Sequence, residues 1–111
     1  MQYKATLTDD AYEFVTGLNE KLKAKVYRTI ALLEEYGPLL SLPHSKRITG
    51  YKGLYELRIQ QSNNLVRLFY FIMDEQVYII TSGYIKKDQK LKKNEINKAV
   101  KIMNLFKKDT I

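Results

Sequence analysis

Apolar residues along this chain recur first with a helical period, then with the period of two that is typical of strands, and finally with a helical period again. Residues 9–36 have apolar side chains at helical spacing, interrupted near residues 17–19, and this predicts a helical hairpin. Thr8 and the two aspartates after it can cap the first helix. Gly37 and Pro38 end the second helix, because glycine adopts a left-handed conformation at low cost and proline cannot continue a helix.

Three strands are predicted in the middle of the chain, each bounded by a short polar turn. They are residues 54–60, 65–73 and 76–84, with a first strand at residues 2–7 and a further short one at Lys46–Ile48 within the loop of residues 39–53. A last helix follows from Glu95. The pattern predicts one α+β domain over residues 1–111: an N-terminal strand and a helical hairpin packed on an antiparallel sheet of three to four further strands, then a C-terminal helix. We expect the helices to lie on one face of the sheet.

The two turns of the predicted sheet determine which residues face one another. With a four-residue loop at residues 61–64 and a two-residue loop at residues 74–75, Arg58 faces Arg67 and Arg67 faces Ser82. Side chains alternate along a strand, so one face is almost wholly apolar. Its residues are Tyr55, Leu57, Ile59, Val66, Leu68, Tyr70, Ile72, Val77, Ile79 and Thr81. The other face is mixed and consists of Glu56, Arg58, Gln60, Arg67, Phe69, Phe71, Tyr78, Ile80, Ser82 and Tyr84.

Both arginines of the predicted sheet lie on its mixed face, directly opposite each other. Opposed like charges destabilise a sheet by a few tenths to ~1 kcal/mol, so we expect a third charge beside them. Glu56 can supply it from the same face, and the arginines are then only a structural ion-pair network. The alternative is that the two guanidinium groups bind a phosphate, for which their planar, bidentate donors are suited. A slip of one residue in either hairpin would remove this arrangement.

Positive charge is concentrated in the second part of the chain. The net charge is +7 overall, with −1 in residues 1–45 and +8 in residues 46–111. Such a distribution favours a polyanionic partner, because phosphates that are neutralised by Lys and Arg release counterions.

The stretch GYIKKDQKLKKNE, residues 83–95, has five lysines and follows directly on the third strand. Tyr84, Lys86 and Lys87 are expected at the edge of the arginine pair, where Tyr84 could stack on a base. The candidates for binding RNA outside this group are Lys90, Lys92, Lys93, Lys46 and Arg47.

Several other classes of chemistry lack support in the sequence. The chain has no cysteine and a single histidine, His44, and no cluster of Asp or Glu at ligand spacing, so we expect neither a metal nor a cofactor. No glycine-rich phosphate loop is present, which argues against nucleotide hydrolysis. No window approaches 18 uninterrupted apolar residues and the first residues lack a secretory pattern, so we expect a cytoplasmic protein without a membrane partner.

RNA can be cut by the residue types that this chain does have. Its 2′-hydroxyl attacks the adjacent phosphate, and a protein need only align the groups, favour deprotonation of the nucleophile and stabilise the added charge. Lys and Arg can do this, and a lysine whose pKa is lowered by neighbouring cations is a candidate base. DNA lacks the 2′-hydroxyl. The residues therefore favour metal-independent cleavage of RNA.

The stretches GLYELRI, LVRLFYFI and SGYIKKDQKLKKNEINKAV resemble toxins of bacterial type II toxin–antitoxin systems. The resemblance is to the RelE/ParE superfamily, in its HigB or phage Gp49-like branch, and covers nearly the whole chain. It implies a RelE-like microbial RNase fold and ribosome-dependent cleavage of mRNA, with mRNA on the ribosome and ribosomal RNA as partners. It also implies neutralisation by a cognate antitoxin, commonly a helix-turn-helix DNA-binding protein, in a heterotetramer.

The resemblance also implies roles by position. The catalytic basic residues of the family correspond to Arg58, Arg67 and Lys87, with Lys86 adjacent and Tyr84 in place of a more usual phenylalanine. Several relatives contribute a tyrosine or histidine from the C-terminal segment, but residues 104–111 contain neither, so no general acid is assigned. Two alternatives stay open: a ParE-like inhibitor of DNA gyrase without RNase activity, and a basic nucleic-acid-binding module without catalysis.

Overall fold

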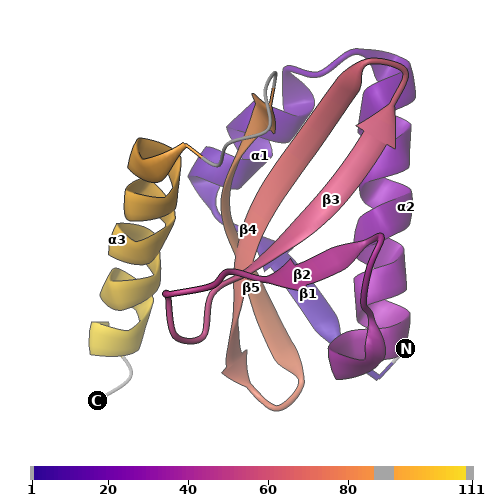
Figure 1. The fold of residues 1–111 in the computed structure, drawn as a ribbon. Helices are drawn as coiled ribbons and strands as arrows, with labels where there is room; N and C mark the ends of the chain where they lie inside the picture. The colour runs from indigo at the N-terminus through magenta and orange to yellow at the C-terminus, as the bar shows by residue number, and fades with distance from the viewer. Residues whose placement is uncertain (1, 87–91, 110–111) are drawn as a thin grey trace.

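The computed structural model of the protein describes residues 2–86 and 92–109, and consists of one five-stranded sheet with helices on both faces (Figure 1). The strands are β1 (Lys4–Leu7), β2 (Ser45–Arg47), β3 (Tyr55–Gln61), β4 (Asn64–Asp74) and β5 (Val77–Lys86). The helices are α1 (Asp9–Thr16), α2 (Glu20–Tyr36) and α3 (Lys93–Asp109), with a 3-10 turn η1 (Gly37–Leu39) after α2. The order across the sheet is β1-β5-β4-β3-β2, with β1 parallel to β5 and the other pairs antiparallel. The predicted α+β class is confirmed.

Helices α1 and α2 form the predicted hairpin and begin where the capping residues indicate. The side chains of Thr8 and Asn19 accept backbone N–H groups of the first turns of α1 and α2, at 3.2 and 2.9 Å. Gly37 ends α2 with φ of 54°, and a Cβ there would collide with the ring of Tyr3. Within the described residues, no helix is long and apolar enough to cross a membrane.

The α1–α2 hairpin covers one face of the sheet, and α3 packs against part of the other (Figure 1). The hairpin face is closed by Ala11, Val15, Leu22, Val26, Ile30, Leu33, Leu57, Ile59, Val66, Leu68 and Tyr70. The α3 face is closed by Ile48, Leu54, Phe69, Phe71, Ile79, Tyr84, Ile96, Ala99 and Met103. The expectation that all helices share one face is therefore wrong. Phe69 and Phe71 alternate with Leu68 and Tyr70 along β4, so both faces of this central strand need apolar cover.

The register predicted for β3 and β4 is confirmed. Arg58 pairs with Arg67, as the symmetric turn requires. The turn itself is shorter than expected, because Gln61 pairs with Asn64 and only the two residues between them reverse the chain. Ser62, the first of these, has φ of 51°. A two-residue and a four-residue loop about the same centre give the same pairing, which is why the prediction survives.

The register predicted for β4 and β5 is wrong, since Arg67 pairs with Tyr84 and not with Ser82. The chain reverses at Glu75 and Gln76, one position later than predicted, so Asp74 pairs with Val77 and the β5 partner of Arg67 moves by two residues. Two bulges then interrupt the ladder. Met73 is an extra residue in β4, and Thr81 is an extra residue in β5. Each bulge shifts the pairing by one residue, in opposite senses, so that only the segment between the bulges changes face.

Between the bulges, the side chains of β5 point to the faces opposite to those predicted. Tyr78 and Ile80 pack under the α1–α2 hairpin, and Ile79 packs under α3. The bulge at Thr81 is held on both sides, because its hydroxyl donates to the carbonyl of Phe69 at 3.3 Å and its own carbonyl accepts from Thr8 Oγ1 at 2.6 Å. Beyond Thr81 the faces agree with the prediction again.

Candidate functional site

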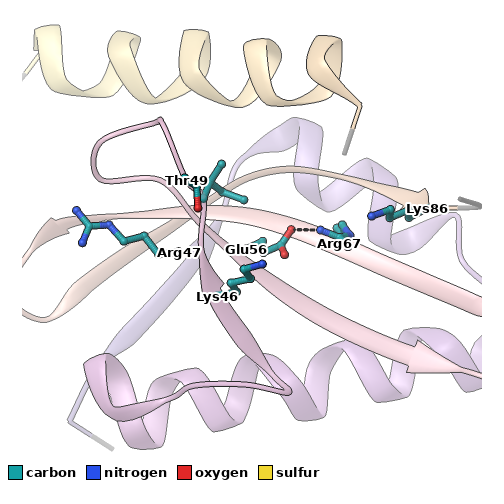
Figure 2. Close-up of a pocket in the computed structure, with 7 residues that line it drawn as sticks. Lys46, Arg47, Thr49, Glu56, Arg67 and Lys86 are labelled. Atoms are coloured by element: carbon teal, nitrogen blue, oxygen red, sulfur yellow. Dashed lines mark hydrogen bonds and ion pairs between the residues drawn. The ribbon is translucent and has the colours of Figure 1, made fainter. Parts of the chain in front are cut away.

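The candidate site is a pocket of about 230 Å³ on the α3 side of the sheet (Figure 2). It is lined by Lys46, Arg47, Ile48, Thr49, Glu56, Arg67 and Lys86. Four adjacent strands contribute charged residues: Lys46 from β2, Glu56 from β3, Arg67 from β4 and Lys86 from β5. Arg47 of β2 also lines the pocket, although its guanidinium points away from Glu56 and Arg67. Figure 2 shows Glu56 between Lys46 and Arg67, with Lys86 beyond Arg67.

Arg67 lines this pocket and is nearly inaccessible to solvent, with 6% of its side chain exposed. Its Nη1 donates to Glu56 Oε2 at 2.5 Å. Its Nε is buried and has no hydrogen-bond partner among the residues that the structure describes. A buried donor without an acceptor costs about 1–3 kcal/mol, and more in a charged group. An anion in the pocket could offset this cost.

Glu56 contacts both arginines of the sheet. Its side chain is only 1% exposed, and Oε1 lies 3.8 Å from Nε of Arg58, whose side chain is 30% exposed. The closer partner is Arg67, although the sequence suggested Arg58. With Lys46 and Lys86 in the same pocket, four cationic side chains surround a single carboxylate. Glu56 is thus the one carboxylate that lines the pocket among residues 2–86 and 92–109, and it is shared between the two arginines.

Arg58 faces a second pocket, of about 350 Å³, on the same face of β3. The backbone of β3 is anchored beside it, because Arg58 N donates to the carbonyl of His44 at 2.8 Å. His44 itself lines neither this pocket nor the one around Arg67. The opposed arginines thus border two hollows on one surface, a geometry that can accommodate consecutive groups of an extended anionic chain.

Tyr84 lies beneath the start of α3 and not in the pocket. Its ring stacks on Phe69 with centroids 5.9 Å apart, and its hydroxyl accepts from the backbone N–H of Lys92 at 3.4 Å. Burial raises the pKa of Tyr84, partly opposed by the hydrogen bond from Lys92 and by the charge of Arg67. A ring buried in this way has no open face for a base. Its position supports Arg67, its partner across the ladder, and does not support stacking on RNA.

Lys46 and Arg47 are neighbours in β2 but belong to different faces of the sheet. Lys46 pairs with Glu56, whereas Arg47 pairs with Tyr55. Both side chains are exposed, and Figure 2 shows the guanidinium of Arg47 pointing away from Glu56 and Arg67. The sequence analysis grouped the two as one RNA-binding pair. Strand alternation separates them once the boundaries of β2 are known.

The lysines after β5 are only partly placed. Lys92 and Lys93 are exposed, directly before and at the first residue of α3. Lys87 and Lys90, which the sequence analysis also named, lie outside the described residues. Across residues 2–86 and 92–109, no group of three or more His, Cys, Asp or Glu side chains could hold a metal ion.

Sequence reasoning missed the loop after β2 as part of the site. Ile48 and Thr49 line the pocket, and the loop turns back through Gly50 and Gly53, which have φ of 88° and 79°. These two glycines were visible in the sequence as a turn signal. The sequence did not indicate that this turn brings the chain back beside the pocket that Arg67 lines.

Comparisons with known proteins agree with this architecture. The family described as "Phage derived protein Gp49-like (DUF891)" matches residues 13–104. A mutant of E. coli toxin RelE in the free state is similar with a TM-score of 0.67 and 20% identity, over 91% of this chain and 97% of that chain. The archaeal RelE–RelB complex from Pyrococcus horikoshii OT3 gives a TM-score of 0.60 and 15% identity, over 81% and 100%.

A third similar structure is the RelB–RelE antitoxin–toxin complex from Methanococcus jannaschii, with a TM-score of 0.53 and 14% identity, over 82% of this chain and 93% of that chain. No curated protein sequence matches the chain. At these identities the likenesses show the fold, which is the RelE fold that the sequence predicted.

Proposed function

We propose that this chain, which belongs to the phage-derived Gp49-like family, is the toxin of a type II toxin–antitoxin system and cleaves mRNA on the ribosome. The Gp49-like resemblance seen in the sequence is confirmed by the match over residues 13–104. Structures of RelE toxins in complex with RelB antitoxins support an antitoxin as the partner of this chain. We expect it to be a helix-turn-helix protein, bound in a heterotetramer in the cytoplasm.

The observation that carries the RNase proposal is the buried guanidinium of Arg67, whose Nε has no acceptor among the described residues, in a pocket that Lys46 and Lys86 also line. A phosphodiester carries one negative charge, and the transition state of its cleavage carries more on the oxygens around phosphorus. Cations that are already fixed in place stabilise this added charge without reorganisation, in a site where water screens them little. Arg58 and Arg67 would together hold the scissile phosphate.

The reaction needs no group beyond the RNA and these side chains. The 2′-oxygen forms a bond to phosphorus, the bond from phosphorus to the 5′-oxygen breaks, and a 2′,3′-cyclic phosphate and a 5′-hydroxyl result. One proton leaves the 2′-hydroxyl and one joins the 5′-oxygen. We assign charge stabilisation and proton transfer to Lys86 and to Lys87, which lies outside the described residues, with Tyr84 supporting Arg67 from below.

Exposed cations around the pocket would hold the larger RNA partner. Lys46, Lys92 and Lys93 are exposed, and with Lys90 they would contact ribosomal RNA. Such contacts are independent of sequence and weaken with salt. Arg47 is on the opposite face of β2, so its contribution to the same RNA should be smaller.

Substitution of Arg67 tests the proposal. Induction of the wild-type protein should stop growth and produce new mRNA 5′ ends that need ribosomes, whereas Arg67→Ala should cut mRNA about 10²–10³-fold more slowly, the loss typical of removing one transition-state donor. Arg67→Lys keeps the buried charge, and loses only the planar donor pair, so it covers the case in which the alanine variant does not fold. Arg28→Ala, on the exposed side of α2, is the matched control and should remain fully toxic.

Two results would contradict the RNase proposal. One is full toxicity of a folded Arg67→Ala protein. The other is a DNA-damage response with intact mRNA on induction of the wild type, which is the behaviour of a gyrase inhibitor.

A further inference from the structure

Glu56 is a buried charged group to which the proposed chemistry assigns no role. It lies in the middle of β3, 1% exposed, with Arg67 Nη1 at 2.5 Å from one carboxylate oxygen and Arg58 Nε at 3.8 Å from the other. Lys46 is its direct partner across the β2–β3 ladder. An acidic residue inside a site for an anion needs an explanation, because it repels the ligand that the site would bind.

Burial of Arg67 supplies part of that explanation. A guanidinium that is almost removed from water, beside Arg58 and Lys86, is strongly disfavoured unless an opposite charge is close to it. Glu56 supplies that charge. Without it, the Arg67 side chain would be more stable turned toward solvent, and its guanidinium would leave the pocket.

The contact also fixes the orientation of the arginine. The hydrogen bond from Nη1 to Glu56 Oε2 restrains the guanidinium, and its Nε remains as a buried donor with no acceptor within the described part of the chain. A donor that is held in position before the substrate arrives needs no reorganisation during the reaction. A mobile arginine would bind phosphate as well but would not be preset for the transition state.

We propose that Glu56 is a positioning residue: acting through Arg67, it presets the guanidinium for the transition state and weakens the binding of ground-state phosphate. This inference rests on the proposed RNase function. The carboxylate lowers the attraction of the site for a singly charged phosphodiester, while the surrounding cations still favour the more negative transition state. Binding and turnover therefore depend on Glu56 in opposite directions.

Kinetics of three variants test this on the intact protein with mRNA on programmed ribosomes. Glu56→Gln keeps the shape and removes the charge, so kcat should fall at least about tenfold while KM falls about two- to fivefold because one repulsive charge is gone. Glu56→Asp keeps the charge but is too short to reach both arginines, so KM should stay near the wild-type value and kcat should fall. Glu75→Gln makes the same charge change in the exposed β4–β5 turn and should alter neither constant.

A merely structural role predicts a different pattern. It would lower kcat in proportion to the folded fraction, with KM unchanged, and Glu56→Asp and Glu56→Gln would then follow their thermal stabilities. A fall in kcat that only follows the thermal stability of each variant, with KM unchanged, would overturn the inference. An unchanged kcat in Glu56→Gln would also overturn it.

A second measurement does not depend on cleavage. In Glu56→Ala, inorganic phosphate can replace the lost carboxylate beside Arg67, so phosphate should raise the melting temperature of this variant several degrees more than that of the wild type or of Glu75→Ala. Glu56→Gln takes its place if the alanine variant does not fold. Equal shifts in all proteins would overturn the placement of Glu56 as the internal anion.

The two measurements separate the two proposals. If the wild type does not cleave mRNA but phosphate selectively stabilises Glu56→Ala, the RNase proposal fails and the charge balance at Arg67 stands. If the wild type cleaves mRNA and Glu56→Gln shows no opposite changes in kcat and KM, the inference on Glu56 alone fails.

Discussion

The two faces of the sheet are buried in different ways. On the face under α1 and α2, the buried side chains of β3 and β4 are apolar or aromatic, with Leu57, Val66 and Leu68 inaccessible to solvent. On the other face, α3 covers Phe69 and Phe71 of β4. Arg67 of the same strand and Glu56 of β3 are buried there as an ion pair.

This difference indicates how the fold tolerates a charged site. A buried ion pair contributes little net stability, since the cost of desolvation can equal or exceed the attraction. Apolar burial contributes about 25 cal/mol per Å² and has no such cost. The hairpin face therefore stabilises the sheet on which the charged row lies, and changes on the two faces should have different effects.

The largest effect on stability is expected from a cavity in the hairpin face. Leu68 is inaccessible to solvent and packs in the core of that face, so Leu68→Ala should lower the free energy of unfolding by about 2–5 kcal/mol. Urea denaturation followed by circular dichroism measures it. Leu105→Ala, at an exposed position of α3, should change it by less than about 0.5 kcal/mol. Equal losses in the two variants would show that burial of Leu68 in the hairpin face adds nothing to stability beyond that of an exposed leucine.

A pH effect of intermediate size is expected at Tyr70, which lies on the hairpin face. Burial raises the pKa of Tyr70 to about 12 from 10.0, partly opposed by its 2.8 Å hydrogen bond with Ser45. Because the folded protein holds this proton more tightly than the unfolded chain, the stabilisation is complete below pH 10 and is lost as the pH rises toward 12. Two pKa units correspond to about 2–3 kcal/mol.

Tyr70→Phe isolates this contribution. Urea denaturation at pH 8 and pH 11 should show a smaller loss of stability with pH in the variant, which has no hydroxyl at this position to ionise. At pH 8 the variant should be about 1 kcal/mol less stable, from the hydrogen bond to Ser45. An identical pH dependence in both proteins would show that burial of Tyr70 does not matter for its ionisation.

The smallest effect is expected from the two neighbouring cations of β2. Lys46→Ala removes a cation from the face of the arginine row, so the slope of log affinity for RNA against log salt should fall by about 0.7, the value for one phosphate contact with a single strand. Arg47→Ala should leave this slope nearly unchanged, because Arg47 belongs to the other face. A larger change for Arg47 than for Lys46 would mean that RNA binds on the hairpin side of β2.

Local signals predicted much of the fold. The caps at Thr8 and Asn19 and the end of α2 at Gly37 depend on neighbouring residues, so the sequence alone indicates them. The pairing of Arg58 with Arg67 also follows from one short symmetric turn. The position of α3 depends on which strand surface is left uncovered after the first layer has packed, and no local pattern contains that information.

The sequence predicted part of the candidate site as well. The opposed arginines and the nearby lysine of β5 follow from alternation along the strands. The preference of Glu56 for Arg67 depends on how the side chains pack, and the burial of Tyr84 against Phe69 and Lys92 depends on the β4–β5 turn and on α3. These are tertiary effects, and they changed the interpretation of Tyr84 from a base-stacking group to a support for Arg67.

The bulges at Met73 and Thr81 act as compensating insertions, one in each strand of the β4–β5 hairpin. Deletion of either residue alone would shift the pairing register of β4 and β5 by one residue. Tyr84 and Lys86 would then lie on the face of the sheet opposite to Arg67. Deletion of both would leave the register at Arg67 unchanged. Related chains should therefore gain or lose these two residues together, and an alignment of such chains should place paired gaps in β4 and β5 where ordinary sequence matching would place none.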